Sequence, residues 1–148
     1  MTNPYFIEVL LIEDRPEDAE LTIRALKQHN LVNEVKWLED GQEALDYLFR
    51  NGEGKDAMVE LPKLILLDLK LPKVNGLEVL EKIKKSEQTK HIPIVVLTSS
   101  KEDVDVGKAY KLGANSYIVK PVDFKSFAES IKQVGLYWLL LNQPPGNK

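Results

Sequence analysis

Four short apolar runs in this sequence end at charged or hydroxyl residues, and this pattern narrows the possible folds sharply. The runs are separated by stretches in which apolar residues recur at helical spacing, which is typical of buried strands in a parallel sheet. The carboxyl ends of parallel strands lie along one edge of the sheet, where such folds bind ligands. The polar residues that follow the four runs are Glu13 with Asp14, Asp68, Thr98 and Lys120. We therefore expect three carboxylates, a hydroxyl and an ammonium in one crevice.

Five strands alternate with five helices in the predicted secondary structure. The expected strands cover residues 7–12, 35–38, 64–67, 94–97 and 116–119. The first expected helix opens at Pro16, and the others cover residues 41–50, 76–85, 101–112 and 123–142. Gly113 marks a helix end, and Asp123 is a candidate N-cap. This alternation predicts an α/β fold in which helices cover both faces of a doubly wound, five-stranded parallel sheet.

The composition fits one domain that spans residues 1–148. The chain can bury its own core, because 43% of its 148 residues are apolar. It contains no cysteine, which excludes disulfides and thiolate metal sites. We expect a cytoplasmic protein without membrane contact, since the sequence has neither a leader pattern nor a run long enough to span a membrane. The net charge of -3 comes without a basic block, which argues against a nucleic-acid partner.

The three carboxylates of Glu13, Asp14 and Asp68 predict a site for Mg²⁺. Each like-charge contact at ~4 Å costs about 1 kcal/mol in water and about 4 kcal/mol at an effective dielectric constant of about 20. A cation between them removes that repulsion, and hard oxygen ligands favour Mg²⁺ over zinc. Asp68 is the candidate nucleophile toward phosphorus and would form an acyl phosphate. Thr98 can donate a hydrogen bond to a phosphoryl oxygen, and Lys120 can supply positive charge.

Several motifs in this chain together resemble the receiver domain of two-component response regulators. They are Leu11-Ile12-Glu13-Asp14, Leu67-Asp68-Leu69-Lys70-Leu71-Pro72-Lys73-Val74-Asn75-Gly76, Leu97-Thr98-Ser99 and Tyr117-Ile118-Val119-Lys120-Pro121. The resemblance covers about residues 6–134 and leaves an extended last helix that reaches about residue 142. It implies a flavodoxin-like receiver fold with strand order 2-1-3-4-5.

The resemblance also implies a role for each residue of the crevice. Asp68 would be the phosphoacceptor. Mg²⁺ would be bound by Glu13, Asp14, Asp68 and the backbone carbonyl of Lys70. The protein would then be a signalling protein that catalyses only its own phosphorylation and dephosphorylation.

Further residues would bind the phosphoryl group and respond to it. Thr98, Ser99 and Lys120 would contact its oxygens. A phosphoryl group adds roughly -1.5 to -2 charge and three acceptor oxygens. The hydroxyl of Thr98 would move toward it and leave space for Tyr117 to turn inward, so these two residues would form the switch. Pro121 would hold Lys120 in place through a cis peptide bond.

Other segments resemble the small stand-alone regulators that serve bacterial phytochromes. They are Arg15-Pro16-Glu17-Asp18-Ala19, the long connection of residues 51–63 and Tyr137-Trp138-Leu139. The implied partner is a sensor histidine kinase, with a phytochrome as the candidate. Arg15 stands where the family usually has Asn or Ser, and its guanidinium is expected near the pocket. His29 and His91 stand in polar surroundings and are expected at the surface, so the phosphodonor would come from another protein.

The last helix is apolar on more than one side. Phe127, Ile131, Val134 and Trp138 recur at helical spacing and can pack one face against the sheet. The additional apolar residues of the last turns are Leu136, Tyr137, Leu139, Leu140 and Leu141. We expect Leu136, Tyr137 and Leu140 to form a symmetric homodimer interface. The alternative is an overhang that folds back on its own subunit.

Three other functional classes compete with this interpretation. A haloacid dehalogenase-type hydrolase needs a second acid two residues after the nucleophile, where this chain has Lys70. A flavin-binding module needs a hydroxyl-rich loop after the first strand, where this chain has Glu13-Asp14-Arg15-Pro16. A degenerate receiver that acts only as an interaction module stays open as the alternative, although the complete set of site residues argues against it.

Overall fold

The computed structural model describes residues 8–28, 34–49, 61–99, 103–121 and 123–141. Within these ranges, five parallel strands form one sheet in the order β2-β1-β3-β4-β5. The strands are β1 (Val9–Ile12), β2 (Val35–Leu38), β3 (Leu64–Leu67), β4 (Ile94–Thr98) and β5 (Ser116–Val119). The predicted strand order is therefore confirmed.

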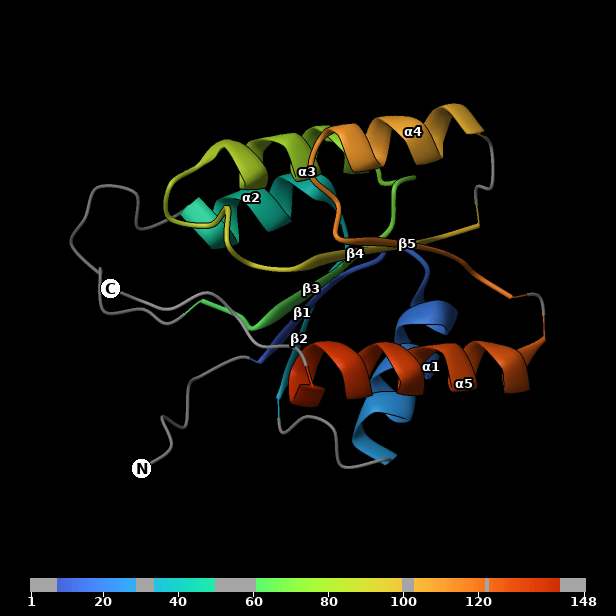
Figure 1. Cartoon of the computed structure of the whole chain (residues 1–148). Coiled ribbons are helices and arrows are strands. Elements are labelled where there is room, and N and C mark those ends of the chain that lie inside the picture. The colour runs from blue at the N-terminus through green and yellow to red at the C-terminus, as the bar shows by residue number, and fades with distance from the viewer. Residues whose placement is uncertain (1–7, 29–33, 50–60, 100–102, 122, 142–148) are drawn as a thin grey trace, which may run out of the picture.

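Five helices cover the two faces of this sheet (Figure 1). Two of them lie on one face, α1 (Pro16–Gln28) and α5 (Phe124–Gly135). Three lie on the other, α2 (Gly41–Phe49), α3 (Gly76–Lys85) and α4 (Asp103–Lys111). The predicted three-layer arrangement is confirmed, and none of the helices in the described ranges is long and apolar enough to cross a membrane.

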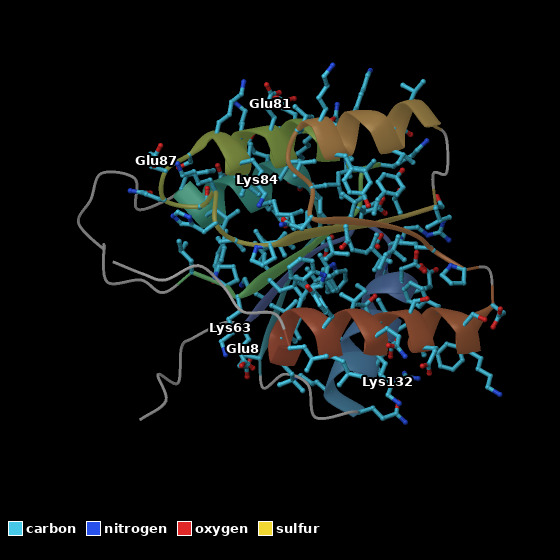
Figure 2. The ribbon with its side chains drawn as sticks, in the orientation of Figure 1. Glu8, Lys63, Glu81, Lys84, Glu87 and Lys132 are labelled. Carbon is cyan, nitrogen blue, oxygen red and sulfur yellow. The ribbon has the colours of Figure 1, made fainter. Side chains whose placement is uncertain are left out.

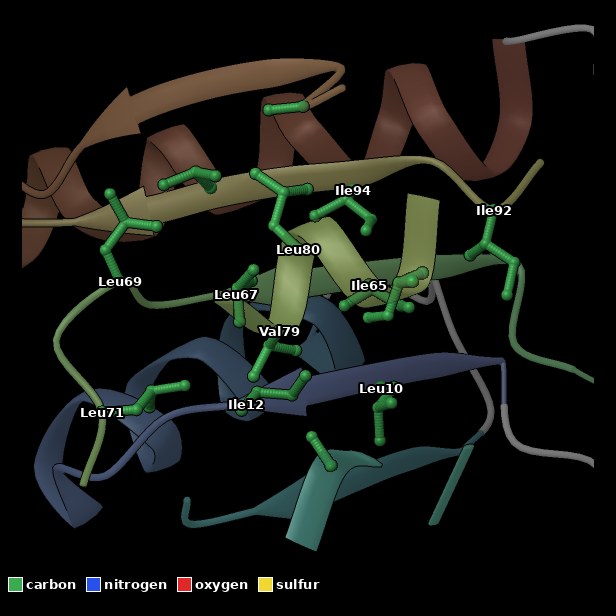
Figure 3. Packing of buried hydrophobic residues seen from close by; sticks show 14 of the residues in the cluster. Leu10, Ile12, Ile65, Leu67, Leu69, Leu71, Val79, Leu80, Ile92 and Ile94 are labelled. Carbon is green, nitrogen blue, oxygen red and sulfur yellow. The ribbon is translucent and has the colours of Figure 1, made fainter. Parts of the chain in front are cut away.

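The continuous apolar runs arise because both faces of the central strands are buried. Alternate side chains of a strand point to opposite faces. Leu10, Ile12 and Leu67 therefore join the core beneath α2, α3 and α4, which Figure 3 shows from close by. Leu11 and Leu66 join the second core beneath α1 and α5. Every residue of β1, β3 and β4 is buried, so the apolar run of each strand is continuous. Polar residues begin where these strands end, at the carboxyl edge of the sheet.

The helix boundaries follow local chemistry. The Asp123 side chain accepts a hydrogen bond from the Ser126 backbone N–H at 2.8 Å, which confirms it as the N-cap of α5. Gly113 follows α4 with a φ of 110°, a left-handed conformation that glycine adopts without strain. The last helix differs from the prediction, because α5 ends at Gly135 and continues as the π-helical segment η1 (Leu136–Leu141). His91 is exposed as expected, while His29 and residues 50–60 lie outside the described ranges.

A half-buried lysine links segments at the amino-terminal edge of the sheet. Lys84 lies on α3 and is labelled in Figure 2. Its Nζ donates hydrogen bonds to the carbonyl oxygens of Ile92 at 2.8 Å and Lys90 at 3.2 Å, and to the Asn115 side chain at 3.0 Å. Burial of its ammonium lowers the pKa of Lys84 below its ordinary value. These contacts tie α3 to the segments that lead into β4 and β5, at the edge opposite to the carboxylates.

Candidate functional site

Three carboxylates converge at the carboxyl ends of β1 and β3, as the strand pattern predicts. Glu13 and Asp14 follow β1, and Asp68 follows β3. One carboxylate oxygen from each residue lies within 4.8 Å of the other two. Glu13 is 1% exposed and Asp68 is 5% exposed, whereas Asp14 is half-buried. This donor set of hard oxygens, with mutually repelling charges, fits a divalent cation such as Mg²⁺.

Lys120 brings an ammonium group into the middle of this cluster. The residue follows β5, and its side chain is 8% exposed. Its Nζ lies 2.7 Å from Glu13 Oε1 and 3.2 Å from Asp68 Oδ2. The predicted meeting of carboxylates and ammonium therefore takes place in the structure, and the lysine offsets part of the negative charge.

A fourth carboxylate, which the strand ends do not reveal, belongs to Asp18. Its Oδ2 accepts a hydrogen bond from Lys120 Nζ at 2.8 Å and lies 3.8 Å from Arg15 Nε. Asp18 stands in the first turn of α1, and the signal for it is indirect. A helix that starts at Pro16, directly after β1, places its first turn beside the strand end. The Arg15 side chain is 65% exposed and lies at the rim rather than in the pocket.

The charges in the pocket shift two pKa values. Burial raises the pKa of Glu13 to about 7, with a contribution from the nearby charge of Asp68, although the hydrogen bond from Lys120 opposes the rise. Burial alone would lower the pKa of Lys120. Hydrogen bonds with Asp18 and Glu13, together with the charge of Asp68, outweigh burial and raise that pKa above its ordinary value. The lysine therefore stays charged, while Glu13 is poised to bind a proton when no metal is present.

Backbone and indole hydrogen bonds hold the acidic side chains in place. The Arg15 backbone N–H donates to Glu13 Oε2 at 3.2 Å, and the Lys70 N–H donates to Asp68 Oδ1 at 3.2 Å. Trp37 of β2 donates its indole N–H to the Glu13 carbonyl oxygen at 2.7 Å. Trp37 was not among the predicted site residues, because tryptophan in a short strand usually serves only packing.

Glycines keep the loop after Asp68 close to the sheet. A Cβ atom at Gly76 would lie 2.4 Å from the Asp68 carbonyl oxygen, so only glycine permits this approach. The Gly76 N–H donates to the Leu69 carbonyl oxygen at 2.8 Å. Within the same loop, Lys73 has a φ of 68°, and its Nζ lies 3.6 Å from the buried Asp40. The loop therefore lies close to the end of β3 at Gly76 and contacts Asp40 through Lys73.

The sequence model of the response regulator receiver domain matches residues 9–132. The chain belongs to this family. It is 43% identical over 145 residues to the probable methanogenesis regulatory protein FilR2 of Methanothrix harundinacea (strain 6Ac), covering 97% of this chain and 90% of that protein. It is 38% identical over 131 residues to the response regulator Rcp1 of Synechocystis sp. (strain ATCC 27184 / PCC 6803 / Kazusa), covering 88% of each chain.

Two solved structures of such regulators match the whole receiver fold. The phosphorylated cyanobacterial phytochrome response regulator RcpA gives a TM-score of 0.86 at 37% identity, covering 95% of this chain and 99% of that one. The Mn²⁺-bound form of Rcp1 gives a TM-score of 0.85 at 36% identity, also covering 95% of this chain and 99% of that one. The chain is therefore a response regulator receiver domain related to Rcp1 and RcpA, which confirms the resemblance to the regulators of phytochromes.

The receiver's predicted phosphoryl-binding residues lie at the same edge, and the predicted switch residue Tyr117 lies within β5. Thr98 ends β4 and is fully buried, and its carbonyl oxygen accepts the Lys120 backbone N–H at 2.8 Å. Ser99, the next residue, is exposed. Tyr117 of β5 is half-buried against the core beneath α4, and its ring centroid lies 6.5 Å from that of Tyr110. The roles of these residues stay predictions.

The peptide bond before Pro121 differs from the expectation. No peptide bond in the described ranges is cis, so the bond between Lys120 and Pro121 is trans. A trans bond is the intrinsically favoured form before proline by about 0.5–1 kcal/mol. The Lys120 side chain reaches three carboxylates from this trans backbone. The expected cis bond at Pro121 is therefore wrong for this structure.

The receiver's last turns divide between the core and the surface. Leu136, Trp138 and Leu139 pack against the core beneath α1 and α5, so part of the segment folds back on its own subunit. Tyr137 is 50% exposed and Leu140 is 61% exposed. Of the three residues expected in a dimer interface, Tyr137 and Leu140 are accessible, whereas Leu136 is partly buried.

Proposed function

We propose that this receiver accepts a phosphoryl group on Asp68 in a Mg²⁺-dependent reaction. The observation that carries the proposal is the buried Asp68 carboxylate, which lies 3.2 Å from Lys120 and among the carboxylates of Glu13 and Asp14. Glu13, Asp14, Asp68 and the backbone carbonyl of Lys70 would hold the metal. Bound Mg²⁺ would supply positive charge against the phosphoryl oxygens of the donor.

The chain's own residues then perform a single displacement at phosphorus. A carboxylate oxygen of Asp68 forms a bond to phosphorus while the bond to the leaving group breaks, and the leaving group keeps the electron pair. From acetyl phosphate the leaving group is acetate, and from a phosphohistidine it is the imidazole. Lys120, Thr98 and Ser99 bind the oxygens of the transferred group, because charge-assisted hydrogen bonds are strongest there.

The signal passes from Asp68 to the surface through Thr98 and Tyr117. The Thr98 hydroxyl moves toward the new oxygens, and Tyr117 turns further into the space beneath α4. Such a switch shifts an existing equilibrium, and moving it from 1:99 to 99:1 takes about 5.5 kcal/mol of differential interaction. Partial switching is therefore the expected response.

The physiological phosphodonor is a sensor histidine kinase, with a phytochrome as the candidate. Support comes from RcpA, which is described as a phytochrome response regulator and is 37% identical over 95% of this chain. The switched receiver relays the signal by protein–protein interaction. A homodimer through Tyr137 and Leu140, with a contribution from Leu136, is the candidate assembly, since these side chains lie on or beside an exposed apolar segment.

Intact-mass measurement tests the phosphoacceptor. The parent protein, incubated with acetyl phosphate and Mg²⁺, should gain one phosphoryl group, and chelation of the metal should prevent this gain. Asp68→Asn should abolish labelling, while the control Asp46→Asn, at an exposed position on α2, should label like the parent. Equal labelling of Asp68→Asn would remove Asp68 from the mechanism.

Sedimentation analysis tests the dimer. The parent should dimerise, and a phosphoryl mimic should strengthen the association. Tyr137→Glu with Leu140→Glu should give a monomer, while the control Lys27→Glu on the exposed side of α1 should not. A parent that stays monomeric at high concentration, with and without the mimic, would contradict this part of the proposal.

A further inference from the structure

Asp18 contacts the lysine of the proposed phosphorylation site from a different element than the other carboxylates do. Its Oδ2 lies 2.8 Å from Lys120 Nζ, which is shorter than the 3.2 Å from Nζ to Asp68. Glu13 and Asp68 approach the ammonium from strand ends, whereas Asp18 approaches from the first turn of α1. Its side chain is 24% exposed, so it lies at the rim of the pocket.

The fold holds Asp18 in this position. The Asp18 carbonyl oxygen accepts a hydrogen bond from the Thr22 hydroxyl at 2.8 Å, and Thr22 is fully buried. The next residue, Ala19, is also fully buried in the core beneath α1 and α5. The backbone of Asp18 therefore cannot shift without moving α1 on the sheet. Any rearrangement at this contact has to come from the side chains of Asp18 and Lys120.

The ammonium of Lys120 has no donor left for a further acceptor. A lysine carries three N–H donors, and Glu13, Asp18 and Asp68 each accept from Nζ. A phosphoryl oxygen on Asp68 can bind Lys120 only if one of these contacts is given up. Glu13 and Asp68 belong to the cluster that can hold a metal ion, whereas Asp18 does not. Its charge therefore stays uncompensated by the ion and keeps attracting the lysine.

We propose that Asp18 is a positioning residue that restrains Lys120 at the rim and weakens the lysine's contact to a phosphoryl group on Asp68. This inference rests on the proposed function of the site. Asp18 competes with the incoming oxygens for the same ammonium and also repels them, because both carry negative charge. The receiver is thereby biased toward its unphosphorylated state. Removal of this one charge shifts the bias toward the phosphorylated state.

The experiment measures the affinity for beryllofluoride, a phosphoryl mimic, at saturating Mg²⁺. Asp18→Asn keeps the shape of the side chain and removes its charge, and it should tighten beryllofluoride binding about fivefold, as expected for loss of one partly exposed ion pair. Glu17→Gln is the matched control, because it removes the same charge from the exposed neighbouring position. Asp18→Glu should restore an affinity near that of the parent.

Fluorine NMR of the bound mimic supplies a readout that a merely structural role would not move. The fluorine signals should differ between Asp18→Asn and the parent, and should coincide for Glu17→Gln and the parent. Equal or weaker binding by Asp18→Asn, with normal binding by the parent, would overturn the role of Asp18 alone. A parent that binds no beryllofluoride, or an Asp68→Asn variant that binds it equally well, would overturn the proposed function and this inference with it.

Discussion

The raised pKa of Glu13 predicts that the metal-free receiver loses stability as the pH rises. The ordinary value of 4.5 applies to the unfolded chain, and burial raises the folded-state pKa to about 7. Between these values the folded protein binds a proton that the unfolded chain has released, so the free energy of unfolding falls with pH. The fall is about 1.4 kcal/mol per pH unit, or about 3 kcal/mol over the whole range.

Chemical denaturation at a series of pH values, with chelator present, measures this loss. Other groups titrate in the same range, so the comparison is with Glu13→Gln, which has similar shape and no titration there. Between about pH 4.5 and about pH 8, the free energy of unfolding of the variant should rise by about 3 kcal/mol relative to that of the parent. A constant difference between the two proteins across this range would refute the argument that burial sets the pKa of Glu13.

The same pKa predicts proton release when the pocket binds its metal. At about pH 6 roughly nine in ten molecules carry the Glu13 proton, and at about pH 8 roughly one in ten does. Binding of Mg²⁺ to the carboxylate should therefore release about 0.9 proton at the lower pH and about 0.1 at the higher. Calorimetry in buffers of different ionisation enthalpy counts these protons. Equal counts at both pH values would contradict the assignment of Glu13 as a ligand.

Three further predictions concern the framework of the site and the opposite edge of the sheet, and urea unfolding checks each of them. Gly76→Ala should lower the free energy of unfolding by about 2–3 kcal/mol, because the added Cβ would lie 2.4 Å from the Asp68 carbonyl oxygen. The control Gly107→Ala has open space around its Cβ and should raise the free energy of unfolding by about 0.5–1 kcal/mol. Lys84→Met should lower the free energy of unfolding by about 1–3 kcal/mol, because three hydrogen bonds are lost. The control Lys85→Met, at an exposed position, should lower it by less than about 0.5 kcal/mol. Trp37→Phe should cost about 1 kcal/mol and should also remove most of the fluorescence change caused by Mg²⁺, since its indole donates to Glu13.

The parts of this receiver that could be predicted from sequence are those that depend on strand ends. Continuous burial of β1, β3 and β4 produces apolar runs that stop where the sheet stops. The positions of Glu13 and Asp68 along the edge therefore follow from the runs alone, whereas Lys120 follows β5, a strand that is only half-buried. Two helix limits were predictable from local chemistry: Asp123 caps the start of α5 through a hydrogen bond, and Gly113 follows α4 through its backbone freedom. The end of α5 at Gly135 was not predicted.

The contacts that could not be predicted come from side chains that reach the site from outside the strand ends. Asp18 depends on how α1 lies against the sheet, and Trp37 depends on the register between β1 and β2. Neither geometry leaves a local signal in the sequence. The isomer before Pro121 is also set by tertiary context rather than by the residue pair, because the intrinsic difference between the two forms is only about 0.5–1 kcal/mol.

The buried carboxylates that lower the stability of the metal-free protein also suit the pocket to its proposed chemistry. Glu13, Asp18 and Asp68 compete for one ammonium, and burial, with a contribution from the charge of Asp68, raises the pKa of Glu13 to about 7. A bound metal ion would offset the repulsion among the carboxylates of Glu13, Asp14 and Asp68. Asp18 would stay on Lys120, because its carboxylate lies outside that cluster. Under the proposed function the pocket would therefore separate two tasks: Glu13, Asp14 and Asp68 would bind the metal, and Asp18 at the rim would determine how readily the lysine turns to a phosphoryl group.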